Sequence, residues 1–209
     1  MDELGDLMLS LQFRYSQQLL DARQRMFKSA SLIADIAPVL AIAPVTEADG
    51  MFDIDTAPKP PKKSWRWIIA ARWGASHKPR YRLRPRGFIA DGLTHDQREA
   101  LKGHYVEDLI ACDPALLTVT ARYACDSAVC GAPAHPGHAE GPVFVHETPL
   151  AWLMSRGSGV FLCGDQAEQQ AWLRGCTAGL TTATVAMGEA ILKKMRRPIP
   201  ALPQVRVYA

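Results

Sequence analysis

The last third of the chain alternates between two kinds of short segment, and this alternation constrains the fold more than any other feature. Residues 143–146 (VFVH) and 160–163 (VFLC) are short apolar runs rich in Val and Phe, a composition that favours strands. Residues 149–155 and 166–173 follow them and have the apolar spacing of helices. This β-α-β-α order predicts an α/β or α+β core in the C-terminal part of the chain.

The first third of the sequence predicts a helix followed by irregular structure. Residues 7–29 have the pattern of an amphipathic helix, which could continue to about residue 36 because Ala37-Pro38 is a natural stop. Residues 39–45 are apolar and could form a strand or a buried turn. Residues 46–63 combine turn formers, three prolines and a change from acidic to basic composition, which is typical of a linker.

The middle of the chain gives weaker signals. Residues 64–74 (SWRWIIAARWG) fit either a helix or a strand, and periodicity does not decide between them. A capping-box pattern at Thr94 predicts a helix to about Ala111, and residues 116–124 have the β-branched alternation of a strand. A last helix is predicted over residues 180–197.

The predicted fold class is therefore α+β, with three parts. An N-terminal helical segment occupies residues 1–45 and a Pro-rich linker residues 46–63. Residues 64–209 form a basic aromatic segment and a mixed α/β C-terminal domain.

Composition excludes several classes of protein. Hydrophobic residues make up 48% of the chain and charged residues 22%, as in ordinary globular proteins. No uncharged apolar run reaches 18 residues, so we expect no membrane helix. The N-terminus, MDELGDLML, lacks the positive region of a secretory signal, and we expect a cytoplasmic protein. Five cysteines, an odd number, argue against a disulfide framework.

Charge is distributed very unevenly along the chain. The formal net charge is +3, but residues 56–90 contain ten Lys or Arg and no Asp or Glu. The remaining residues contain 14 basic and 21 acidic side chains. A block of one sign inside an oppositely charged chain is a long-range field for phosphates or for an acidic partner.

This basic block is interleaved with aromatic residues, and the combination suits nucleic acid. Cations replace the counterions of the phosphate backbone, and aromatic rings stack on unpaired bases. Pro79 and Pro85 favour an extended chain, in which alternate arginines share one face. The candidate contact residues are Lys62, Lys63, Trp65, Arg66, Trp67, Arg72, Trp73, Lys78, Arg80, Tyr81, Arg82, Arg84 and Arg86.

Other interpretations of the same block remain open. Its charge could bind an acidic protein partner, or the acidic remainder of this chain. A basic strand can also be an edge protected from aggregation, with neighbouring tryptophans in the core and arginine stems packed over them.

A loop rich in Pro and Gly, CDSAVCGAPAHPGH, carries two cysteines and two histidines. Thiolate and imidazole groups are the ligands that zinc prefers. Cys125, Cys130, His135 and His138 are therefore candidate ligands, with zinc as the candidate cofactor. Their spacing is not a standard one, and the alternative is buried thiols beside a solvated loop.

Two carboxylates follow predicted strands: Glu147 after VFVH and Asp165 after VFLCG. If the strands are parallel neighbours, both groups would face one crevice and could hold Mg²⁺ for phosphoryl transfer. Residues 143–164 locally resemble the opening of a Toprim domain, in which a strand ends in a catalytic Glu and a helix leads to a second strand. The acidic pair that this resemblance implies further on is not in the sequence. The alternative is that both carboxylates lie at helix N-termini.

The sequence thus predicts a nucleic-acid-associated binding or accessory protein that uses the segment 62–86. The alternatives are a metal-dependent phosphoryl-transfer enzyme with Glu147 and Asp165, and an interaction or assembly protein that grips an acidic partner.

Overall fold

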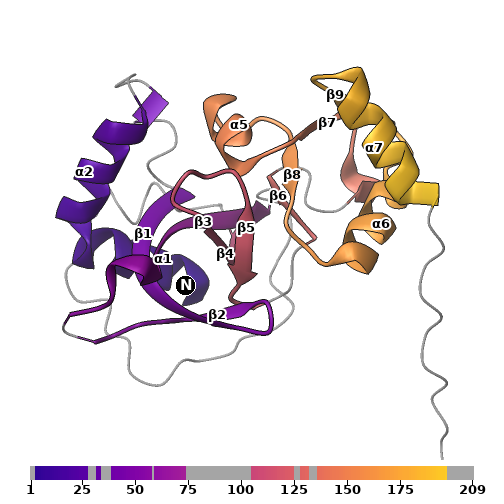
Figure 1. Ribbon diagram of the computed structural model, residues 1–209. Helices are drawn as coiled ribbons and strands as arrows, with labels where there is room; N and C mark the ends of the chain where they lie inside the picture. The colour runs from indigo at the N-terminus through magenta and orange to yellow at the C-terminus, as the bar shows by residue number, and fades with distance from the viewer. Residues whose placement is uncertain are drawn as a thin grey trace, which may run out of the picture.

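The computed structural model of the chain describes residues 3–27, 32–33, 39–57, 59–73, 105–124, 128–131 and 136–196 (Figure 1). These residues form mixed α+β structure with two sheets, which confirms the predicted fold class. The helices are α1 (Glu3–Arg14), α2 (Ser16–Met26), α5 (Pro149–Met154), α6 (Gln166–Gly175) and α7 (Val185–Arg196), with 3-10 turns η2 (Lys62–Ser64) and η3 (Pro136–His138).

The first sheet is a closed barrel with the strand order β1-β2-β5-β4-β3. Its strands are β1 (Leu40–Ala48), β2 (Met51–Ile54), β3 (Trp65–Trp73), β4 (Tyr105–Cys112) and β5 (Val119–Arg122). All neighbours are antiparallel except β2 and β5, whose parallel pairing closes the barrel at Met51 and Arg122.

The residues that composition marked as a linker, 46–63, contain part of this barrel. β1 extends through the boundary at residue 45 to Ala48, and β2 follows after a two-residue turn. Asp49 and Gly50 in that turn have φ angles of 52° and 78°, the positive values that a tight hairpin with the right twist requires. Residues 46–54 therefore form a hairpin within the sheet.

Residues 105–112 form strand β4, which corrects the predicted helix over this part of the chain. β4 pairs with β3 on one side and β5 on the other. Its residues Leu109 to Cys112 are all buried, so they form a continuous apolar run. Such a run fits a strand covered on both faces as well as a buried helix, and the two sheet partners decide the outcome. Residues 94–104 lie outside the described residues.

Strand β3 resolves the ambiguity of residues 64–74 in favour of a strand. Its side chains alternate between two hydrophobic clusters. Ile68 and Ala70 pack in a cluster with residues of α1. Trp67, Ile69 and Ala71 pack in a second cluster, which includes residues of α2 and of the second sheet. We call this second cluster the shared core.

The N-terminal helical prediction is confirmed in kind, but the helix is divided. α1 ends at Arg14 and α2 begins at Ser16. The residue between them, Tyr15, is buried against the barrel with its ring edge-on to Trp65 at a centroid distance of 5.2 Å. The division lets each helix direct an apolar face to a different part of the barrel.

The second sheet confirms the predicted β-α-β-α order. It contains β6 (Val129–Gly131), β7 (Val143–His146), β8 (Val160–Leu162) and β9 (Leu180–Thr182) in the order β6-β8-β7-β9. β7, β8 and β9 are parallel, and β6 is antiparallel to β8. Residues of α5 pack in the shared core on one face, whereas residues of α6 and α7 pack in a third cluster on the other.

The predicted final helix over residues 180–197 is corrected at its start. Residues Leu180–Thr182 are strand β9, and the helix begins at Val185. Thr181 and Thr182 pair with Phe144 and Val145 of β7. The Thr184 hydroxyl then accepts a hydrogen bond of 3.2 Å from the amide of Met187, which starts α7.

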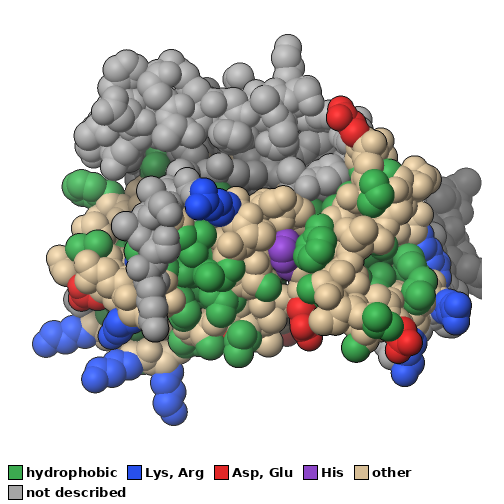
Figure 2. Space-filling view, turned by 90° about the horizontal axis from the view of Figure 1, so that it is seen from above, with side chains coloured by type: hydrophobic (Ala, Val, Ile, Leu, Met, Phe, Trp, Pro, Cys, Tyr) green, Lys and Arg blue, Asp and Glu red, His purple; other side chains and the backbone are tan. Residues whose placement is uncertain are grey.

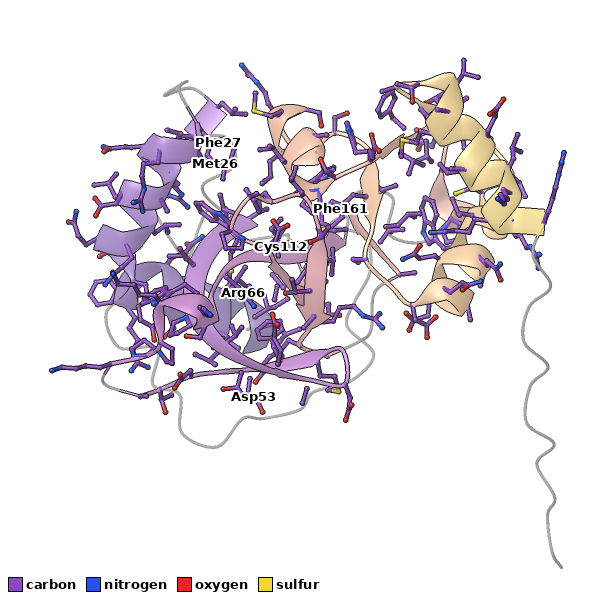
Figure 3. All side chains as sticks on the ribbon, viewed as in Figure 1. Met26, Phe27, Asp53, Arg66, Cys112 and Phe161 are labelled. Atoms are coloured by element: carbon purple, nitrogen blue, oxygen red, sulfur yellow. The ribbon has the colours of Figure 1, made fainter. Side chains whose placement is uncertain are left out.

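The barrel and the second sheet pack against each other. Cys112 of the barrel and Phe161 of the second sheet both belong to the shared core, and Figure 3 shows them close together where the two sheets meet. The amide of Leu150 donates to the carbonyl of Leu116 at 2.8 Å. Arg122 and Glu168 form an ion pair of 2.8 Å across the same junction. The two sheets therefore share one continuous core.

Candidate functional site

The structure describes part of the basic aromatic segment. Lys62 and Lys63 lie in η2, and Trp65, Arg66 and Trp67 begin strand β3. Arg72 and Trp73 lie at the end of β3, where the backbone alone is described. The remaining candidates lie outside the described residues: Lys78, Arg80, Tyr81, Arg82, Arg84 and Arg86.

The start of the segment presents three exposed lysines, Lys59, Lys62 and Lys63, which we call the lysine corner. The Ser64 hydroxyl and amide both donate to the carbonyl of Pro61, at 2.7 and 3.0 Å, and these bonds hold the turn that carries two of the lysines. Among the described residues, no ion pair involves any of the three ammonium groups. Lys59 was not among the candidate contacts, although it belongs to the same acid-free block.

Arg66 is occupied by an internal ion pair. Its guanidinium contacts both carboxylate oxygens of Glu47, at 2.9 and 3.3 Å. The Thr120 hydroxyl donates to the same carboxylate at 2.6 Å, and the guanidinium also donates to the carbonyl of Lys63 at 2.7 Å. The acidic remainder of the chain therefore neutralises this one arginine.

Both tryptophans of the basic segment whose side chains are described have structural contacts. Trp67 is 3% exposed, its indole N–H donates to the carbonyl of Pro114 at 3.1 Å, and its ring lies edge-on to Phe27. Trp65 is half-buried and packs against Tyr15. Trp67 is therefore a core residue, as the core interpretation of the tryptophans expected, whereas Trp65 is only partly covered.

The Cys/His loop does not assemble in the described part of the chain. Cys125 and His135 lie outside the described residues. Cys130 is fully buried in the shared core, and its thiol donates to the carbonyl of Ala70 at 3.7 Å. His138 belongs to η3, which packs through Pro136 against α6, on the other face of the sheet. Among the described residues, no three or more His, Cys, Asp or Glu are grouped to hold a metal ion. Zinc binding stays a prediction for this loop.

Glu147 and Asp165 follow β7 and β8, which are parallel neighbours as the phosphoryl-transfer hypothesis requires. However, neither carboxylate lies in a strand, because β7 ends at His146 and β8 ends at Leu162. Among the described residues, neither belongs to a group of three or more side chains that could hold a metal ion.

Asp165 has a structural role that explains its position. Its carboxylate accepts from the amide of Glu168 at 2.8 Å, and the Glu168 carboxylate accepts from the amide of Asp165 at 2.6 Å. This capping box confirms the helix-cap interpretation of Asp165. The third parallel strand, β9, ends in Thr181 and Thr182, so it adds no carboxylate to this edge.

Sequence reasoning missed a polar cluster around His146. Its Nε2 lies 2.8 Å from the carbonyl oxygen of Ser158 and 3.2 Å from the hydroxyl of Ser155. A carbonyl oxygen only accepts, so Nε2 carries the proton. Ser155 donates its own proton to the carbonyl of Trp152 at 2.7 Å. Nε2 is therefore unable to act as a base toward Ser155, and the cluster holds the turn after α5.

Comparison with known proteins adds no family to this picture. No protein-family model matches the chain, and no curated protein or solved structure is significantly similar to it. None of the helices that the structure describes has the length and apolar character needed to span a membrane. The candidate site therefore depends on the charge and geometry of the chain itself.

Proposed function

We propose that the protein binds nucleic acid through the basic segment 62–86 and works as a binding or accessory protein in the cytoplasm. The observation that supports this is the charge distribution. Ten cations and no acidic residue occupy residues 56–90, whereas the rest of the chain is net acidic. Such a separation attracts a polyanion to one part of the molecule and repels it from the remainder.

The described start of the segment has the properties that such a contact needs. The lysine corner is exposed, and within the described part of the chain its ammonium groups have no carboxylate partner. Arg66 contributes little, because Glu47 already neutralises it. Lys and Arg side chains project mainly from the margins of the face shown in Figure 2, and the middle of that face is largely hydrophobic.

An acidic protein partner would use the same charges and is the main competing explanation. It differs from nucleic acid in one measurable respect. Phosphates condense counterions, whose release makes binding to nucleic acid depend steeply on salt concentration. Phosphoryl transfer through Glu147 and Asp165 has less support, because Asp165 caps α6 and the described residues contain no group of three or more possible metal ligands.

The deciding experiment measures binding of a short labelled duplex over a series of salt concentrations. A variant with Arg80, Arg82 and Arg84 replaced by Ala should bind more weakly. The slope of log affinity against log salt should become shallower by about three, about one for each lost phosphate contact.

The matched control replaces three exposed arginines outside the segment, Arg14, Arg25 and Arg196, by Ala. It changes the net charge by the same amount, so an effect of net charge alone would appear in both variants. The proposal fails if the wild-type protein does not bind at low salt. It also fails if the two triple variants lose affinity equally. A third contrary result would be that polyglutamate displaces the duplex as effectively as a nucleic acid with the same number of charges.

A further inference from the structure

The proposed function leaves open whether the partner is single- or double-stranded. Proteins that bind single strands without sequence preference combine cations with exposed aromatic rings, on which the bases stack. Proteins that bind a duplex through its backbone need only the cations. The environment of the tryptophans in the basic segment distinguishes these two modes.

Trp65 and Trp67, the tryptophans of the segment with described side chains, are committed to the fold. Trp67 is 3% exposed and donates its indole N–H to Pro114. Trp65 packs edge-to-face with Tyr15 at a centroid distance of 5.2 Å and an interplanar angle of 81°. Burial closes the Trp67 ring to a base in this structure, and Tyr15 covers part of the Trp65 ring.

Arg66 is likewise unable to serve as a stacking surface. A guanidinium can lie flat on a base, which makes arginine a second source of stacking in nucleic-acid sites. In this structure the Arg66 guanidinium is held by both oxygens of Glu47 and by the carbonyl of Lys63. Within the acid-free block, the described cations that remain exposed and without a carboxylate partner are the three of the lysine corner. Ammonium groups act on phosphates as compact point charges and have no planar surface for stacking on bases.

We infer that the partner of the basic segment is double-stranded nucleic acid, contacted along its phosphate backbone at the lysine corner. This inference depends on the proposed function and specifies its partner. A duplex carries about one charge per 1.7 Å of its axis, and each contact with it releases more counterion than a contact with a single strand. In the described part of the segment, neither tryptophan forms an open stacking platform, so a single strand gains nothing there to compensate for its lower charge density.

The test compares one labelled duplex with each of its separate strands at the same salt concentrations. We expect the duplex to bind at least about tenfold more tightly, which is about the factor that one absent base stack would cost a single strand. Tryptophan fluorescence is recorded in the same titrations, because a base stacked on an indole quenches it. We expect no quenching by the single strands, and this measurement also covers Trp73, whose side chain is not described.

A double variant, Lys62→Ala with Lys63→Ala, assigns the contact to the lysine corner. It should make the salt slope for the duplex shallower by about two. The control is Lys193→Ala with Arg196→Ala, which removes two exposed cations from α7, at the end of the molecule away from β1 (Figure 1).

Each outcome has a separate meaning. Tighter binding of single strands with tryptophan quenching would overturn the duplex inference and leave the proposed function in place. Equal behaviour of the two double variants would overturn the assignment to the lysine corner. An absence of binding to duplex and single strands at low salt would instead refute the proposed function itself.

Discussion

Trp67 lies in the core that joins the barrel to the second sheet, so its replacement by Phe separates a structural role from a stacking role. The Phe variant loses the hydrogen bond of 3.1 Å to the carbonyl of Pro114, worth about 1 kcal/mol. The smaller ring also leaves a void among side chains at a position that is 3% exposed, which costs about 1–2 kcal/mol. We expect the free energy of unfolding to fall by about 2–3 kcal/mol, or a melting temperature about 5–10 °C lower.

Chemical denaturation followed by circular dichroism measures this change, and the duplex titration is repeated at a temperature where both proteins are folded. Trp65→Phe is the control. Trp65 is half-buried and its edge-to-face contact with Tyr15 can be kept by Phe, so we expect a loss below about 1 kcal/mol. The reasoning is refuted if Trp67→Phe leaves stability unchanged, or if it weakens nucleic-acid binding while the fold stays intact.

Three further substitutions and one labelling experiment test other contacts. Glu168→Ala removes an ion pair across the junction of the two sheets and half of a capping box, and should lower the free energy of unfolding by about 1–2 kcal/mol; an unchanged denaturation midpoint would contradict this. Partial burial by itself would raise the pKa of Asp113, but hydrogen bonds from the amides and hydroxyl of its own loop outweigh burial and lower it. The ionised carboxylate therefore stabilises the fold above its unfolded pKa of about 3.9. Asp113→Asn should be less stable than the wild type at neutral pH, and denaturation curves should show this difference narrowing as pH falls below that value. A difference that widened in acid would mean that folding raises the pKa of Asp113. Burial raises the pKa of the Cys112 thiol, so mass spectrometry after treatment with a thiol reagent should find it unlabelled in the native protein and labelled after unfolding. Glu47→Gln releases the Arg66 guanidinium from its ion pair. The slope of log affinity for the duplex against log salt should then steepen by about one, while the free energy of unfolding changes by less than about 1 kcal/mol. An unaltered slope would mean that Arg66 does not reach the nucleic acid.

The central part of the second sheet could be predicted from the sequence because its signals are local. β7 and β8 are short and rich in Val and Phe, and turn formers separate each of them from the following helix. The cap of α6 was also predictable, since Asp165 followed by Glu168 lets two side chains bond two otherwise unpaired amides within four residues. The start of α7 was misplaced, because β9 gains its strand conformation from pairing with β7. β6 was missed inside the predicted loop, because it is a strand through its pairing with β8.

The barrel was harder to predict because its pairings join distant segments. β4 is a strand because β3 and β5 flank it, and no local pattern in residues 105–112 reports those neighbours. The hairpin of β1 and β2 did leave a local signal, the Asp49-Gly50 pair, since this dipeptide suits a tight turn with positive φ. The prolines and acidic residues around it were given more weight, and the stretch was interpreted as a linker.

What the sequence determined by itself is the distribution of charge: ten cations in an acid-free block within an otherwise acidic chain. Charge is a property of residue types, and it needs no fold to be counted. Only the tertiary structure decided which of these groups are available, because burial and pairing depend on segments far away in the chain. Glu47 and Thr120 hold Arg66, whereas Tyr15 and Pro114 engage the two tryptophans. A segment that looked suited to stacking on bases therefore offers, in its described part, lysine charge alone.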